Sequence, residues 1–268
     1  MQRIASRLAS IAALALVVSP AIAADEKAAA PAVDPAVVEL VRRAGDHLRA
    51  AERFSFQADT RYGVVQEDAF ELEFGATRHY LVKRPDRVRV EVQPRSGNDR
   101  LIVFDGDHLT VAEPRAKLYA QLRFDQHREI DEALVLLREM LGVPIPLGEL
   151  LRSDPRPDLV GSLTEAFHVG TAKLAGTECD HVALRNPDAD LQLWIARGDA
   201  PLLQRVVITY RNEEGAPSFA ADFRDWSLDA NAPDEQFRYD PPADFERIRF
   251  SVPARPEDAA GKPAPEAP

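Results

Sequence analysis

The residues best suited to chemistry are a cysteine and a histidine two positions apart. Cys179 is the only cysteine of the chain, and His181 shares its face if the segment is a strand, because strand side chains alternate. Such a pair could be a nucleophile with its base, or half of a metal site. We favour the simpler interpretation, a small buried thiol beside a capped or surface histidine, because no second histidine and cysteine cluster completes a site.

A second candidate for metal binding is the run from Asp105 to His108, in which Gly106 separates two aspartates. A tight hairpin explains these residues better, because such turns prefer aspartate and glycine. The six histidines otherwise lack the spacing of metal ligands; they stand at positions 47, 79, 108, 127, 168 and 181. The sequence also lacks a nucleophile elbow, a phosphate-binding loop and a dinucleotide fingerprint. We therefore expect a protein that is not an enzyme and that binds no cofactor or metal.

The charge balance argues against two classes of partner. The chain has 268 residues and a formal net charge of −11, whereas binding to nucleic acid or capture by anionic lipid depends on basic patches. Hydrophobic residues make up 45% of the chain, enough for a substantial core in one domain with flanking segments. A single cysteine cannot form an internal disulfide, so stability must come from that core.

The N-terminus has the features of a cleaved signal peptide, residues 1–23. Two arginines precede a short apolar run, residues 8–18, and a small-x-small cleavage site follows at Ala21 to Ala23. The apolar run is too short to span a bilayer, and no other stretch is long and apolar enough. Cleavage before Ala24 removes two arginines and changes the net charge from −11 to −13. We expect the mature protein in the periplasm, without stable membrane insertion.

Two helices are predicted from capping residues and apolar spacing. Asp34 and Pro35 form a good start, an N-cap followed by proline at the first helical position, and apolar residues recur at helical spacing up to about Ala51. Residues 129–141 form the second helix, with Gly142 as its C-cap. This helix is apolar around most of its girth, which predicts burial on more than one side. Short segments limited by prolines follow it and suit a lid or a plug.

Composition sets the limits of the domain. Residues 24–33 are rich in alanine and charge and are expected to be mobile. Residues 253–268 form a tail rich in proline and alanine, which favours disorder. The residues between them, 34–252, are predicted to form one domain, because we find no internal repeat. Within that domain, residues 232–250 are expected to wrap back over the sheet.

Alternating apolar and polar residues predict about eleven strands. The chain is organised around a meander at Asp190–Leu228, in which Gly/Pro-rich turn clusters separate three strands. Leu193, Ile208 and Phe223 each belong to the apolar face of one meander strand, and the opposite face is charged. A sheet with one apolar face must cover something apolar.

Several short motifs carry a resemblance to a known family. They are Leu193-Trp194-Ile195, Gly198-Asp199, Pro201-Leu202, Val207-Ile208-Thr209-Tyr210 and Asp225-Trp226 in the meander, with Cys179-Asp180-His181 and Phe104-Asp105-Gly106 before it. The chain resembles a group of predicted periplasmic proteins of unknown function, similar to the lipoprotein-localisation superfamily of LolA, LolB and LppX. The resemblance covers roughly residues 34–250. Its motifs are turns and strands, so it is more specific for fold than for function.

The resemblance implies a mainly β fold with some α (α+β): a curved antiparallel sheet that forms a half-open β-barrel, closed by helices over an apolar cavity. It implies a non-enzymatic periplasmic carrier for lipid, lipoprotein acyl chains or another hydrophobic molecule, with a lipoprotein or envelope protein as a further partner. Each methylene buried in such a cavity contributes about 0.8 kcal/mol. The expected ligand-binding residues line the sheet and the helical lid; they are Phe56, Leu72, Phe74, Val90, Leu134, Leu137, Leu147, Leu150, Leu193, Ile208 and Phe223.

Three alternatives stay open at this point. The same fold could serve as an envelope protein–protein interaction or stress-sensing module, which predicts an exposed apolar groove or an open sheet edge. The apolar face could instead be filled by the protein's own helices, leaving no room for a ligand. A hydrolase that uses Cys179 and His181 predicts that both side chains point into a cleft.

The two tryptophans are ambiguous. Strand alternation places Trp194 on the face opposite Leu193 and Trp226 on the face opposite Phe223. They either pack under the helix at residues 34–51 or ring the mouth of a cavity. We favour packing, because large aromatic side chains usually serve the core.

Overall fold

The computed structural model describes residues 33–66, 70–141, 146–155, 160 and 162–250. The predicted signal peptide, the tail and Gly142 lie outside the described residues, as does the predicted mobile segment apart from Val33. The chain divides into two units, Met1–Ala30 and Pro31–Pro268. All elements described below belong to the second unit.

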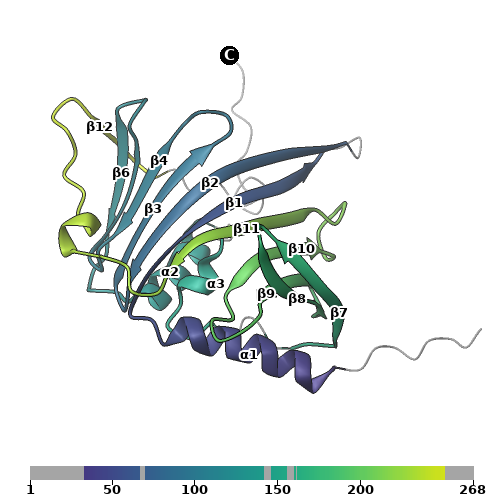
Figure 1. Ribbon diagram of the computed structural model, residues 1–268. Helices are drawn as coiled ribbons and strands as arrows, with labels where there is room; N and C mark the ends of the chain where they lie inside the picture. Colours follow the sequence, from purple (N-terminus) through teal and green to yellow (C-terminus); the bar gives the residue numbers. More distant parts are fainter. Residues whose placement is uncertain (1–32, 67–69, 142–145, 156–159, 161, 251–268) are drawn as a thin grey trace, which may run out of the picture. The chain divides into compact units, whose positions relative to one another are not determined.

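In the residues that the structure describes, the second unit contains a twelve-stranded sheet, three α-helices and a 3₁₀ turn (Figure 1). The strands are β1 (Arg53–Val65), β2 (Glu71–Lys83), β3 (Arg87–Pro94), β4 (Arg100–Phe104), β5 (His108–Glu113), β6 (Leu118–Arg123), β7 (Glu165–Leu174), β8 (Thr177–Arg185), β9 (Ala189–Ala196), β10 (Leu203–Tyr210), β11 (Ser218–Ser227) and β12 (Glu246–Ile248). The helical elements are α1 (Pro35–Arg49), α2 (Ile130–Leu141), α3 (Gly148–Leu151) and η1 (Asp234–Phe237).

Two antiparallel meanders make up the sheet. Strands β1 to β6 follow one another in space, as do β7 to β11, and the pairing of β1 with β11 joins the two sets. The order is β12-β6-β5-β4-β3-β2-β1-β11-β10-β9-β8-β7. The sheet is curved, and α2 and α3 lie on its concave side (Figure 1). Its edge strands, β12 and β7, do not pair with each other. The predicted curved sheet is thus found and is unclosed, and its closure into a barrel is not confirmed.

The predicted strand count was one too low. Each of the eleven predicted strands is present, and the twelfth, β12, was missed. This strand has three residues, all exposed, so no alternation of apolar residues marks it. It pairs parallel with β6, which also corrects the expectation of a wholly antiparallel sheet. The preceding 3₁₀ turn, η1, buries Phe237 against the convex side and Arg89 Nη1 donates to the Gln236 carbonyl at 3.2 Å, so this segment does return to the sheet.

Register confirms the predicted apolar face of the central meander. Leu193 of β9 lies opposite Val206 of β10, and Val206 lies opposite Ala221 of β11. One row further along, Leu191, Ile208 and Phe219 are paired in the same way. Directly opposed residues share a face of the sheet, so these rows form one continuous apolar surface on the concave side.

Helix α1 begins where its capping residues predict. Asp34 has extended dihedral angles, its Oδ1 accepts from the Ala36 backbone N–H at 2.8 Å, and Pro35 occupies the first turn. This satisfies one of the free N–H groups of the first turn. The helix ends at Arg49, about two residues before the predicted end. Its buried positions recur at helical spacing; they are Val37, Val41, Ala44, Gly45 and Leu48.

Helix α2 is buried less completely than its composition predicts. It begins at Ile130, one residue after the predicted start. Ala133 and Leu137 are buried in the core, Leu134 is partly buried, and Val135 is 47% exposed. The expectation of burial on more than one side was therefore wrong for the face that carries Val135, because no described element covers that face.

A β-bulge decides the position of Trp226. The β1–β11 register shifts between Ser55 and Gln57, and Asp225 adopts a left-handed backbone with φ of 56°. An extra residue in one strand turns the next side chain towards the other face. Trp226 therefore lies on the same concave side as Phe223, with ring centroids 5.7 Å apart, and the prediction of opposite faces was wrong for this pair.

Candidate functional site

Most of the predicted ligand-binding residues are packed into the core. Seven are buried, and they are Phe56, Val90, Leu137, Leu147, Leu150, Leu193 and Phe223. The Phe56 ring shows how tightly they pack, because it lies 4.5 Å from the Tyr80 ring and 4.5 Å from the Trp226 ring, centroid to centroid. Leu134 and Ile208 are partly buried against the same core. A ligand could reach the seven buried side chains only if α1, α2 or α3 moved away.

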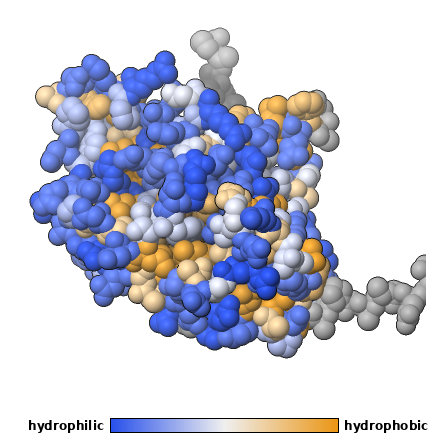
Figure 2. Space-filling view, viewed as in Figure 1, coloured by the Kyte–Doolittle hydropathy of each residue, from blue (hydrophilic) through white to orange (hydrophobic). Residues whose placement is uncertain are grey.

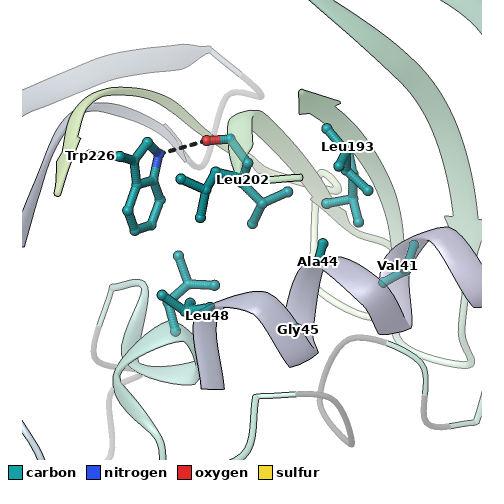
Figure 3. Close-up of a pocket in the computed structure, with 10 residues that line it drawn as sticks. Val41, Ala44, Gly45, Leu48, Leu193, Leu202 and Trp226 are labelled. Atoms are coloured by element: carbon teal, nitrogen blue, oxygen red, sulfur yellow. Dashed lines mark hydrogen bonds between the residues drawn. The ribbon is translucent and has the colours of Figure 1, made fainter. Parts of the chain in front are cut away.

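The space beneath α1 is almost filled. An apolar cavity there has a volume of about 10 Å³ and lies between α1 and the concave face of the sheet (Figure 3). Val41, Ala44 and Leu48 line it from the helix, and Leu193 lines it from the sheet. A volume of this size holds about one water-sized sphere, so an acyl chain does not fit.

Trp226 closes one side of this cavity. Its indole Nε1 donates to the Leu203 carbonyl at 2.8 Å (Figure 3), which satisfies the one polar group of a buried indole. The packing predicted for the tryptophans is thus found for Trp226. Trp194 lies elsewhere, on the convex side, where its ring stacks on His181 at 4.0 Å and the Arg205 guanidinium lies 5.5 Å from it.

The remaining predicted residues mark a different part of the concave face. Leu72 is 39% exposed and Phe74 is 46% exposed, both near the free end of the β1–β2 hairpin. Register places further apolar residues beside them on neighbouring strands. We call this group the open apolar surface; it consists of Tyr62, Val64, Leu72, Phe74, Ile208 and Phe219. In Figure 2, hydrophobic residues gather at the tip of this hairpin, at the upper right.

The open apolar surface is one continuous row with an extension along the hairpin. Phe74 pairs with Tyr62, Tyr62 with Phe219, and Phe219 with Ile208, so the row crosses four strands. The Tyr62 and Phe74 rings stack with centroids 5.7 Å apart. Strands lie about 4.8 Å apart, which gives the row a length of roughly 14 Å. Leu72 and Val64 extend it by one step towards the tip.

Sequence reasoning missed half of this surface. Tyr62, Val64 and Phe219 were not among the predicted ligand-binding residues. The sequence did contain a sign of this surface. The inward positions of β1 and β2 remain apolar up to the tip of the hairpin, where no described helix packs on them. An amphipathic strand usually loses its apolar residues where nothing covers them, so the persistence of Leu72 and Phe74 to the hairpin tip was informative.

Arg78 interrupts the apolar concave face on β2. Inward positions on β2 read Val82, Tyr80, Arg78, Ala76 and Phe74, by their register with β1. The Arg78 guanidinium Nη1 donates to the Thr60 hydroxyl of β1, and that hydroxyl donates to the Ala76 carbonyl at 2.9 Å. Tyr80 lies deeper, where its hydroxyl donates to the Pro146 carbonyl at 3.1 Å and burial raises its pKa above the ordinary value.

Cys179 and His181 do not form a catalytic pair. Cys179 is fully buried, its Sγ lies 3.5 Å from the Thr177 carbonyl, and burial raises the pKa of the thiol. A raised pKa disfavours the thiolate, which is the nucleophilic form. His181 stacks on Trp194, and its Nε2 lies 3.1 Å from Gln192 Oε1. These contacts match the simpler interpretation of both residues.

The run from Asp105 to His108 is the predicted hairpin turn. It joins β4 to β5, Gly106 has φ of 89°, and Asp105 Oδ1 accepts from the backbone N–H groups of Asp107 at 3.0 Å and His108 at 2.7 Å. This is the usual way in which aspartate stabilises a turn. Within the part of the chain that the structure describes, no group of three or more histidine, cysteine, aspartate or glutamate side chains is arranged to hold a metal ion.

The convex face is charged, as predicted. Asp222 accepts from both Arg61 and Arg205, the latter at 3.0 Å. A polar groove of about 430 Å³ lies beside these groups at the free end of the hairpins. Its two arginines are already paired with Asp222, so the groove offers a ligand less unsatisfied charge than the concave face does.

A family model matches the greater part of the chain. The family is described as "Predicted periplasmic protein (DUF2092)", and residues 37–251 match it. The chain belongs to this family. The periplasmic description of the family agrees with the compartment expected from the sequence. Among proteins of curated function, no match to this family member is found.

Solved structures similar to this family member include proteins of the superfamily named above. The lipoprotein LppX of Mycobacterium tuberculosis is 17% identical, with 74% of this chain and 98% of that chain covered and a TM-score of 0.44. A LolA superfamily protein from Nitrosomonas europaea is 14% identical, with 76% and 97% covered and a TM-score of 0.38. The MucA/MucB complex of Pseudomonas aeruginosa contains a chain 17% identical, with 80% and 63% covered and a TM-score of 0.42.

In the residues that the structure describes, no helix is both long and apolar enough to cross a membrane.

Proposed function

We propose that this chain is a non-enzymatic periplasmic protein that binds a hydrophobic molecule, such as a lipid or a lipoprotein acyl chain, on the open apolar surface. The observation that carries the proposal is the exposure of Leu72, Phe74, Tyr62 and Val64 on a face whose other half is packed into the core. Contiguous exposed apolar patches on soluble proteins usually mark binding sites. The site lies in the open half of the concavity, beyond the filled space under α1.

The energetics favour an acyl chain as the ligand. Each methylene removed from water contributes about 0.8 kcal/mol, so eight methylenes along the row would contribute roughly 6 kcal/mol before the cost of ordering the chain. The aromatic rings of Phe74, Tyr62 and Phe219 offer flat contact area to such a chain. No charge or reactive group is needed for this binding, which accords with a protein that is not an enzyme.

Export is part of the proposal. Cleavage of residues 1–23 before Ala24 would release a mature chain whose single domain, residues 34–252, carries the open apolar surface. The family description supports this compartment. A periplasmic protein that binds hydrophobic molecules could carry them across an aqueous space in which they are poorly soluble.

The test replaces one aromatic ring of the surface by a charge. Phe74→Asp should weaken binding of a fluorescent apolar probe such as N-phenyl-1-naphthylamine by tenfold or more, because a carboxylate inside an apolar contact is costly to desolvate. Val169→Asp is the matched control, since Val169 is 50% exposed but lies on the edge strand β7. Equal binding by wild type and Phe74→Asp would contradict the proposal. Lipids that co-purify with the native protein, identified by mass spectrometry, would name the ligand.

A second candidate is an envelope protein–protein module that binds an apolar peptide on the same surface. The observation in its favour is that the surface is open, whereas a carrier usually encloses its ligand. Co-purification from periplasmic extract separates the two candidates. A protein retained by wild type and lost with Phe74→Asp, with no lipid present, would favour the module over the carrier.

A further inference from the structure

Arg78 is the one charged residue at the inward positions of the strands that form the open half of the concave face. Register gives these positions on β1, β2, β3, β10 and β11, and all the others are apolar or Thr60. On β2 the cation lies between the buried Tyr80 and the exposed Phe74. Arg78 is partly buried, and the paired residues Ala76 and Thr60 lie between it and the open apolar surface.

The hydrogen-bonding capacity of Arg78 is mostly unused. A guanidinium has five N–H donors, and within the described residues it donates to the Thr60 hydroxyl alone. No carboxylate lies within ion-pairing distance of Arg78 in the described ranges. Arg100 differs from Arg78 in this respect. It lies in the same cross-strand row, because Val92 pairs with Arg78 on one side and with Arg100 on the other. Its Nε, however, donates to Glu113 Oε1 at 2.9 Å. Among the residues that the structure describes, Arg78 is therefore a positive charge on the concave face with no negative partner.

The Thr60 hydroxyl gives Arg78 a fixed position. The hydroxyl oxygen accepts one N–H of the Arg78 guanidinium, and its own O–H donates to the Ala76 carbonyl. Both the acceptor and the donor role of the hydroxyl are therefore occupied. A guanidinium held on one side presents its remaining donors in a planar fork, which matches a carboxylate or a phosphate group. In partly apolar surroundings such a charged pair is stronger than in water.

We propose that Arg78 binds the anionic head of an amphiphile whose acyl chain lies on the open apolar surface. The ligand class is a single-chain lipid with a carboxylate or a phosphate head, and this inference rests on the proposed function above. Arg78 and Phe74 are four residues apart on one strand, which corresponds to about 13 Å. A head at Arg78 and a chain that extends along Phe74, Tyr62 and Phe219 therefore fit one extended molecule.

The experiment measures displacement of N-phenyl-1-naphthylamine from the full mature chain at pH 7.5 by three probes with the same twelve-carbon chain. These are dodecanoate, dodecyl phosphate and dodecanol, each below its micellar concentration. Wild type should bind the two anions at least tenfold more tightly than the alcohol. Arg78→Met should reduce that preference to within twofold, Arg78→Lys should retain part of it, and Arg100→Met should leave it unchanged.

The outcomes distinguish the role of Arg78 from the proposed function, the binding of a hydrophobic molecule on the open apolar surface. Equal binding of all three probes by wild type would overturn the role of Arg78 and leave the apolar surface intact. Failure of wild type to bind any of the three would overturn the proposed function and the anion site with it. Acetate and inorganic phosphate, added alone, should not compete at millimolar concentration; competition by them that depends on Arg78 would indicate a site for free anions and contradict the amphiphile. If Arg78→Met does not fold by circular dichroism, the comparison of Arg78→Lys with wild type decides.

Discussion

His127 joins two loops of the first meander through its two ring nitrogens. Nε2 lies 2.8 Å from Asp86 Oδ2, and Nδ1 lies 3.2 Å from Asp107 Oδ1. The hydrogen bonds to Asp107 and to Asp86 raise the pKa of His127 above its ordinary value. A histidine with a raised pKa in the folded state adds stability that is fully present below its unfolded pKa, about 6.5, and is lost as pH rises through the folded pKa.

The first prediction follows from the raised pKa of His127 in the folded state. His127→Gln should lower the free energy of unfolding more at pH 5.5 than at pH 8.5, by about 0.2–1 kcal/mol at the lower pH, the range for exposed ion pairs. Urea unfolding at the two pH values and low salt measures the difference. The same substitution at His47 on α1 serves as the control. A loss that was larger at pH 8.5 would contradict the assignment of charge to His127.

At the scale of elements, Arg84 ties three segments together. It lies in the turn after β2, and its guanidinium donates to the carbonyls of Leu48 at 3.0 Å, Ala51 at 2.6 Å and Arg152 at 2.7 Å. It also lies 4.7 Å from the centre of the Phe54 ring. Burial lowers its pKa to about 10, which still leaves it protonated at neutral pH. The C-terminal end of α1 and the segment after α3 are thus both fixed to the sheet by one side chain.

The prediction at the scale of elements concerns a variant that lacks the hydrogen bonds of Arg84. Arg84→Met keeps the length of the side chain and leaves the buried carbonyls without their donor, which should cost on the order of 1–3 kcal/mol. The melting temperature should fall accordingly. Arg53→Met is the matched control, because Arg53 pairs with an exposed partner, Asp229, at 2.9 Å and should cost less than about 1 kcal/mol. Equal effects of the two substitutions would show that Arg84 is not the anchor of α1.

At the scale of the domain, the pairing of β1 with β11 makes one sheet from two meanders. Residues 34–252 are therefore proposed to unfold as one unit, although their two halves are consecutive in sequence. The tryptophans report on different places, since Trp226 packs beneath α1 and Trp194 stacks on His181 at the convex face. Their separate environments allow the cooperativity of the sheet to be measured.

The domain-scale prediction concerns two single-tryptophan variants, Trp194→Phe and Trp226→Phe. In each variant the thermal transition followed by tryptophan fluorescence should coincide with that followed by far-ultraviolet circular dichroism, as expected for two-state unfolding. Trp226→Phe should be the less stable variant, because it loses the hydrogen bond to Leu203 and part of the aromatic cluster. Two separate transitions in either variant would show that the meanders unfold independently.

The sequence by itself determined which face of each strand is apolar. Alternation is a local property, so Leu193, Ile208 and Phe223 could be assigned to one face before any pairing was known. Turn residues such as Asp105 and Gly106 fixed a hairpin for the same reason, and Asp34 with Pro35 fixed the start of α1. The resemblance to predicted periplasmic proteins also came from local motifs, which are those of turns and strands.

Only the tertiary structure decided which apolar residues are covered. Phe56 and Phe74 look equivalent in sequence, yet Phe56 is buried in one core with residues of α1, α2 and α3, whereas Phe74 is exposed. Coverage depends on where distant helices end. The bulge at Asp225 places Trp226 on the concave side, although strict alternation predicts the convex side. Strand β12 is exposed and has no alternating apolar residues from which it could be predicted. The lack of a negative partner for Arg78 among the described residues also depends on several neighbouring strands, so one strand alone could not predict it.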